Sequence, residues 1–232
     1  MLDLHADLAA GVRDADGAWR FIRRFAEGYA EPIGAGDGFA EDDLRAAEQR
    51  LGLSLPKALC DLYTLFGRRR DLTDVQDRLL APWQLQFDPT GQVLEFRVEN
   101  QHVTRWGIEK GALAEPDPPV VLKVPGGGWR NYLDRVSLAA VEMAMSEWIL
   151  DGDIADNRQL EDEPLDRWFR RLPLPDYPLW AEPDGAPTRW YATQDTLLRV
   201  DDAAWLWVRA RTPEALDEVR DKLPGDWIQA PV

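Results

Sequence analysis

The chain offers few side chains that could act as nucleophiles, proton shuttles or metal ligands. It has two histidines, His5 and His102, and one cysteine, Cys60. A zinc site takes about four nitrogen or sulfur ligands, or about three with a bound water. A hydroxyl or thiol nucleophile would need His102 as its base, because His5 lies near the chain end. We therefore predict no catalytic residues, no metal site and no cofactor, and we expect His102 to be an exposed loop residue.

Three other segments resemble ligand-binding loops only loosely. The run Gly34–Gly38 contains G-x-G-x-G, but no strand precedes it, as a dinucleotide site requires. Gly126–Gly128 is followed by Trp and Arg rather than by the Lys and Ser/Thr of a phosphate loop. In the acidic loop that starts at Asp151, the glycine is at position 2 and not at position 6 of a calcium loop. A hydrolase that uses Asp and Glu alone stays open as an alternative.

The charge of the chain bears on its partners. Asp and Glu total 42, Lys and Arg total 27, and the net charge is −15. Such a field repels nucleic acid and anionic membranes, and it speeds the encounter with a basic protein. The same charge would serve solubility alone. We expect a protein partner, no nucleic acid and no membrane, while the oligomeric state stays open with a monomer slightly favoured.

The cellular compartment is predicted from three features of the sequence. One cysteine allows no intramolecular disulfide. The first residues are acidic and lack the apolar segment of a signal peptide. There is no run of 18 apolar residues that could span a bilayer. These features favour a cytoplasmic protein.

The apolar pattern predicts elements of both kinds. Helical periodicity places helices at 16–30, 40–51, 56–66, 137–150 and 212–223. Ser137 is the expected N-cap of the fourth helix, and Gly52 the C-cap of the second. Alternation and turn residues predict strands at 83–87, 93–99 (half-buried), 103–108 and 120–124, one from Trp129, and three more at 189–192, 197–200 and 204–210. The stretch 151–187 reads as irregular.

Residues 46–67 carry a family resemblance. They read Ala-Ala-Glu-Gln-Arg-Leu-Gly-Leu-Ser-Leu-Pro-Lys-Ala-Leu-Cys-Asp-Leu-Tyr-Thr-Leu-Phe-Gly, a helix ending in Leu-Gly, a Leu-Pro step and a second helix. This block resembles the opening of the SUKH superfamily. Phe96–Gln101, Thr104–Gly107 and Pro118–Val121 are similar to the strands that follow in that family, and 137–150 is similar to its closing helix. The resemblance covers residues 34–150.

The resemblance implies an α+β fold, a twisted and mostly antiparallel sheet with helices packed against it. We expect an N-terminal helix and spacer at 1–33, the SUKH-like core at 34–150, and a C-terminal extension at 151–232. The extension would hold an acidic linker, strands and a final helix, packed on the core. The resemblance also implies binding without catalysis. Bacterial members are largely immunity proteins that neutralise toxins, many of them nucleases, and fungal relatives regulate cell-wall synthesis.

We therefore expect an immunity protein that binds a toxin domain, with an intracellular scaffold or regulatory adaptor of the same fold as the alternative. Eleven tryptophans are more than a chain of this length needs, and aromatic side chains often anchor interfaces. The candidate partner-binding residues, all on strands or turns of the predicted sheet, are Trp83, Glu99, Asn100, Gln101 and Trp106.

Overall fold

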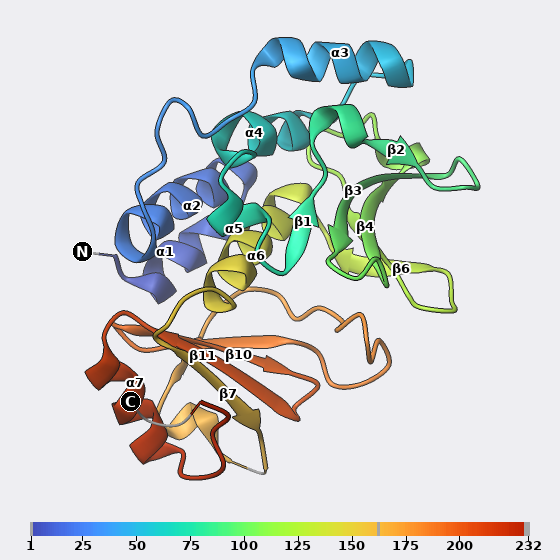
Figure 1. Cartoon of the computed structure of the whole chain (residues 1–232). Helices are drawn as coiled ribbons and strands as arrows, with labels where there is room; N and C mark the ends of the chain where they lie inside the picture. Colours follow the sequence, from blue (N-terminus) through green and yellow to red (C-terminus); the bar gives the residue numbers. More distant parts are fainter. Residues whose placement is uncertain (1, 162, 230–232) are drawn as a thin grey trace.

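The computed structural model describes residues 2–161 and 163–229 and shows an α+β fold (Figure 1). Its α-helices are α1 (Leu4–Gly11), α2 (Ala15–Tyr29), α3 (Glu41–Leu51), α4 (Lys57–Phe66), α5 (Arg70–Thr73), α6 (Val136–Ile149) and α7 (Pro213–Lys222). Short 3₁₀ turns lie at η1 (Pro82–Gln84), η2 (Lys110–Ala112) and η3 (Leu165–Arg167). The strands form two antiparallel sheets.

The first sheet has the order β1-β3-β4-β5-β6, with β2 also pairing with β3. Its strands are β1 (Asp77–Leu79), β2 (Gln86–Phe87), β3 (Val93–Glu99), β4 (Arg105–Glu109), β5 (Val120–Lys123) and β6 (Trp129–Leu133). Consecutive strands pair with their neighbours from β3 to β6, as expected for an antiparallel meander. A register shift between Glu95 and Arg97 leaves Phe96 without a partner on β4. Such a bulge changes which side chains share a face of the strand.

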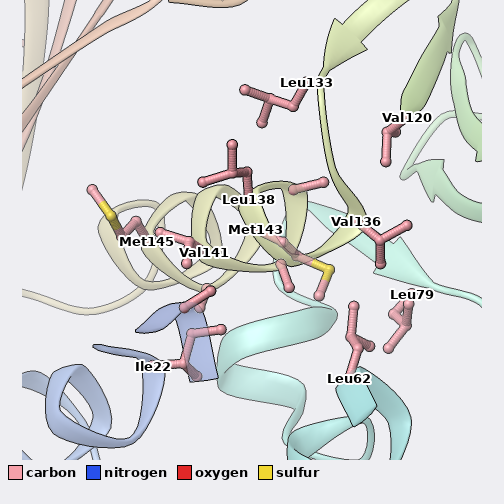
Figure 2. Packing of buried hydrophobic residues seen from close by; sticks show 14 of the residues in the cluster. Ile22, Leu62, Leu79, Val120, Leu133, Val136, Leu138, Val141, Met143 and Met145 are labelled. Carbon is pink, nitrogen blue, oxygen red and sulfur yellow. The ribbon is translucent and has the colours of Figure 1, made fainter. Parts of the chain in front are cut away.

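Helix α6 is the centre of the main core. All fourteen of its residues are buried, which is the pattern of a helix packed on every side. Figure 2 shows Val141 and Met143 of α6 among side chains from α2, α4 and the first sheet. The helix begins at Val136 and not at the predicted cap Ser137. Its first turn is capped from a distance, because Asp117 accepts hydrogen bonds from the backbone N–H (2.9 Å) and hydroxyl (2.5 Å) of Ser137.

The second sheet has the order β7-β11-β10-β9-β8. Its strands are β7 (Ala155–Gln159), β8 (Arg170–Arg171), β9 (Arg189–Ala192), β10 (Thr196–Asp201) and β11 (Trp205–Ala210). Helix α7 packs on one face, where Leu206 and Val208 join a small apolar cluster with Leu216 and Val219. The opposite face lies against the C-terminal part of α6 (Figure 1).

The C-terminal part of the chain, after α6, is also continuous with the main core. Tyr177, Trp190 and Leu197 belong to the same buried cluster as helices α2, α4 and α6. The indole of Trp190 donates a hydrogen bond to the Tyr177 hydroxyl at 2.8 Å. The residues from 151 onward therefore complete the core that the first 150 residues begin.

Most of the predicted elements are present within a residue or two. Gly52 ends α3 in the left-handed conformation, with φ of 68°, as its C-cap role requires. Thr212 caps α7 by accepting a hydrogen bond from the backbone N–H of Ala215. The sequence did not predict α1 near the N-terminus, the single turn α5, strand β1, or strands β7 and β8 within the stretch read as irregular.

Two strand predictions need correction. The expected strand at 83–87 is a 3₁₀ turn followed by the two-residue β2, because Pro82 starts a turn that the side chain of Gln84 closes onto Ala81. Strand β3 is buried along its whole length and is not half-buried. Glu95 and Arg97 form ion pairs, whereas the Glu99 carboxylate accepts hydrogen bonds from backbone N–H groups. Within the described part of the chain, no helix is long and apolar enough to cross a membrane.

Candidate functional site

Trp83 is the most exposed aromatic residue that the structure shows. It lies in η1, and 63% of its surface is exposed. Its ring meets Phe39 edge to face, with centroids 5.6 Å apart and planes at 83°. Phe39 in turn packs edge to face on the buried Tyr63 of α4. The core thus fixes one edge of the indole and leaves the rest to solvent.

Trp83 borders a groove of about 510 Å³ between the start of α3, the end of α4 and strand β1. Three arginines line it, Arg68, Arg70 and Arg78. The guanidinium of Arg68 is 5.8 Å from the centre of the Phe39 ring, and Arg70 pairs with Asp74 at 3.1 Å. The groove therefore combines an exposed indole with cationic side chains, a composition that is enriched at the energetic centres of protein interfaces.

Arg78 gives this groove an unfilled hydrogen-bonding group. Its Nε is buried and has no hydrogen-bond partner among the described residues. A buried donor without a partner costs free energy comparable to a lost hydrogen bond. An acceptor oxygen that reached this donor would recover that free energy.

The other predicted binding residues are not gathered around Trp83. Asn100 and Gln101 are exposed in the turn between β3 and β4. Glu99 is buried and serves that turn, because its carboxylate accepts hydrogen bonds from the backbone N–H groups of Gln101 (2.8 Å) and Val103 (3.2 Å). His102 occupies the left-handed region, with φ of 64°, and is exposed as expected of a loop residue. Glu99 thus shapes the hairpin and is unavailable to a partner.

Trp106 lies in the core and not on the surface, so its prediction as a contact residue needs correction. Only 3% of it is exposed. The guanidinium of Arg97 lies 4.5 Å from the ring centre, and Tyr132 meets the ring edge to face at 6.1 Å. A desolvated cation over an indole is a favourable contact of about 2 kcal/mol. Trp106 therefore packs against a buried charge.

That charge belongs to a buried network that the sequence analysis missed. Arg97 is 2% exposed and contacts three carboxylates, those of Glu142 (2.7 Å), Asp77 (3.0 Å) and Glu147 (3.1 Å). Glu147 also accepts hydrogen bonds from the backbone N–H groups of residues 75–77. The partners of Arg97 lie on β1 and α6, so no short motif in the sequence could have indicated them. Four buried ionisable side chains join the first sheet to the central helix.

Burial sets the protonation of these carboxylates in different ways. It raises the pKa of Glu147 to about 7, an increase that Asp77 reinforces and Arg97 opposes. Burial also raises the pKa of Asp77. For Glu142 burial acts in the same direction, but the nearby Arg97 and Arg199 outweigh it and lower the pKa. The network therefore holds one ionised carboxylate firmly and two that take up protons more readily.

The remaining reactive groups are few. In residues 2–161 and 163–229 there is no group of three or more His, Cys, Asp or Glu side chains arranged to hold a metal ion. Burial raises the pKa of the Cys60 thiol to about 11, so the sulfur is protonated at neutral pH and is a poor nucleophile. The exposed Trp83 groove is consequently the best candidate for a functional surface.

Comparison with known proteins adds no assignment: no protein-family model, curated protein or solved structure matches this chain.

Proposed function

We propose that this protein is a binding module that neutralises a toxin, in the manner of an immunity protein, and that Trp83 and its groove form the centre of the contact. The observation that carries the proposal is the exposure of Trp83, held in place by Phe39 and flanked by Arg68 and Arg78. Trp and Arg are the side chains most enriched among residues that dominate binding energy.

Global and local charge have different roles in this proposal. The net charge of −15 attracts a basic partner over a long range and raises its association rate. The groove itself carries Arg68, Arg70 and Arg78 against Asp43 and Asp74. The partner would therefore be basic overall, yet present carboxylate or backbone carbonyl oxygens to the groove, where the Nε of Arg78 lacks an acceptor.

The resemblance of residues 46–67 to the opening of the SUKH superfamily gives the proposal its biological setting. The block forms parts of α3 and α4 and the step between them. Phe39 precedes α3 and contacts Tyr63 of α4, so these two helices carry the support of Trp83. Immunity function rests on this resemblance as an analogy, while the contact surface rests on the geometry of the groove.

The experiment co-expresses the chain with a toxin domain encoded by a neighbouring gene and measures growth and complex formation. The wild-type chain should restore growth and co-purify with the toxin. Trp83→Ala should lose both, while Trp168→Ala should retain both. Trp168 is a suitable control, because it is 43% exposed and lies elsewhere, with Arg167 4.6 Å from its ring centre. No rescue by the wild-type chain, or loss on Trp168→Ala but not Trp83→Ala, would refute the proposal.

A further inference from the structure

A second cavity, of about 520 Å³, opens where β1 and the end of α6 meet the second sheet. It reaches the surface beside Ala181, which is exposed. It is separate from the Trp83 groove, with which it shares no lining residue. The side chains that give the cavity its chemical character are Asp77, Trp180, Arg199, Asp201, Trp205 and Trp207.

Three indoles line this cavity. Trp205 and Trp207 are two residues apart on β11 and share the face opposite α7. Their ring centroids are 6.2 Å apart, with planes at 55°. Trp180 comes from the loop between β8 and β9. The indole N–H of Trp207 donates to Asp201 at 3.0 Å and fixes that ring. Indole faces attract cations more strongly than the other aromatic side chains do.

The cation already present at the cavity is fully engaged. Arg199 pairs with Asp201 at 2.9 Å and donates to the hydroxyl of Ser146 at 3.0 Å. Asp201 accepts a further hydrogen bond from the hydroxyl of Thr188 at 2.8 Å. Arg199 is therefore neutralised and poorly placed to attract an anion into the cavity.

Asp77 is different, because one of its oxygens is unused. Asp77 is 9% exposed, and its Oδ2 contacts Arg97, whereas its Oδ1 is buried without a hydrogen-bond partner among the described residues. The connected side chains, all buried except the half-buried Arg199, include four carboxylates, on Asp77, Glu142, Glu147 and Asp201, and two guanidinium groups, on Arg97 and Arg199. With every carboxylate ionised, negative charge would be in excess beside the aromatic walls. Buried charge of this kind is costly unless it is paired.

We propose that this cavity binds an organic cation, a guanidinium or alkylammonium group that lies against the indoles of Trp205 and Trp207 and donates a hydrogen bond to Oδ1 of Asp77. When the carboxylates of the network are ionised, the bound cation balances their excess negative charge. Its source is either a free small molecule or a basic side chain of another protein, and both supply the same chemistry. This inference does not depend on the Trp83 groove.

The test is calorimetric titration of the whole chain, without any partner, with n-butylguanidinium. The neutral isostere n-butylurea and the anion butyrate are the controls. We expect n-butylguanidinium to bind at one site and at least about tenfold more tightly than n-butylurea, as a cation–π contact combined with a charged hydrogen bond would produce. Equal affinity for the two, tighter binding of butyrate, or the absence of a saturable signal would overturn the proposal.

Variants locate the site. Trp205→Ala removes one wall and should weaken binding about fivefold or more, whereas Trp168→Ala should leave the affinity unchanged. Trp205 is half-buried, and its indole nitrogen has no hydrogen-bond partner among the described residues. The substitution therefore breaks no hydrogen bond of that nitrogen. Unchanged binding in Trp205→Ala with normal circular dichroism would contradict the site. Trp83→Ala should bind the cation normally, which separates this proposal from the proposed function.

A second pair of ligands identifies the source of the cation. A neutral peptide with a single arginine is compared with the same peptide carrying citrulline. Binding of the arginine peptide but not of the citrulline peptide assigns the cavity to a protein side chain. Binding of n-butylguanidinium with no binding of either peptide assigns it to a free small molecule.

Discussion

The guanidinium of Arg97 on β3 lies 2.7 Å from the carboxylate of Glu142 on α6, and both side chains are 2% exposed. Glu142 also connects to the second sheet. The Ser146 hydroxyl donates a hydrogen bond to its carboxylate and accepts one from Arg199 of β10. The Tyr177 hydroxyl is 3.5 Å from the same carboxylate. One chain of polar contacts thus connects the first sheet, the central helix and the second sheet.

Removal of the charge of Arg97 should destabilise the protein strongly. We expect Arg97→Met to lower the free energy of unfolding by about 3–5 kcal/mol, because it leaves buried carboxylates unpaired. Urea denaturation at pH 7.5 measures the change. The control is Arg45→Met, since the side chain of Arg45 is 57% exposed and pairs with Glu41 and Asp42 on the surface of α3. A surface pair contributes about 0–1 kcal/mol, so equal effects of the two substitutions would contradict the role of the network.

The raised pKa of Glu147 predicts a pH dependence of stability. The pKa is about 7 in the folded protein and ordinarily 4.5, so the folded state holds its proton at pH values where the unfolded chain has lost it. The contribution of Glu147 to stability is therefore complete below about pH 4.5 and is lost as the pH rises to about 7, a change on the order of 3 kcal/mol. The groups that face its carboxylate are Arg97, Asp77 and the backbone N–H groups of residues 75–77.

Glu147→Gln removes this titration. The free energy of unfolding of the variant minus that of the wild type should increase as the pH rises from 4.5 to 7.5. This holds whatever the value of the difference at pH 4.5. Chemical denaturation at several pH values gives the difference. Glu218→Gln on α7, where the side chain is 72% exposed, serves as the control and should show a nearly constant difference from the wild type. A constant difference for Glu147→Gln as well would show that its pKa is not raised.

Gly107 is required by close packing in the first sheet. A Cβ at this position would lie 2.4 Å from Cγ1 of Val93 and 2.8 Å from the carbonyl oxygen of Leu94 on β3. We expect Gly107→Ala to destabilise the fold by about 1–3 kcal/mol, the usual cost of overpacking. Gly111→Ala is the matched control, because a Cβ there meets nothing within 4 Å. The same thermal midpoint for both variants would contradict the close packing of Gly107 against β3.

The first 150 residues should not fold by themselves. Truncation after Leu150 removes Tyr177, Trp190 and Leu197 from the main core and exposes the side of α6 that they cover. We expect the 1–150 fragment to lack a cooperative unfolding transition and the near-ultraviolet circular dichroism of the full chain. A fragment that unfolds cooperatively with the same midpoint would show that the C-terminal part of the chain, after α6, is an independent addition.

Local signals explain why several elements could be predicted from the sequence. Gly52 and Pro56 mark the end of α3 and the start of α4, and each acts through its own backbone conformation. Strand β7 could not be found in this way, because Asp156 and Arg158 are its buried residues. Asp156 pairs with Arg220 of α7 at 2.6 Å, and Arg158 donates to the carbonyl oxygens of Leu223 and Pro224. Distant partners make this polar segment a strand.

Local signals and tertiary contacts also differ in what they reveal of the candidate site. Tryptophan content predicted an aromatic contact surface, and the structure exposes Trp83 but buries Trp106. The difference arises from tertiary packing, since Tyr132 and Arg97 on other strands of the first sheet cover Trp106 whereas Trp83 meets Phe39 along one edge. Alternation along β3 suggested a solvent face for Arg97. Its three carboxylate partners lie 20, 45 and 50 residues away, beyond the reach of any local pattern.

If Trp83 anchors a protein partner as proposed, its removal should weaken the affinity for the proposed toxin domain. Titration calorimetry should show that Trp83→Ala raises the dissociation constant by about 30-fold or more, equivalent to a loss of about 2 kcal/mol or more. The thermal midpoint of the free variant should stay close to that of the wild type, because most of the indole is exposed. Trp168→Ala should bind like the wild type. An unchanged dissociation constant for Trp83→Ala would show that Trp83 does not anchor the partner.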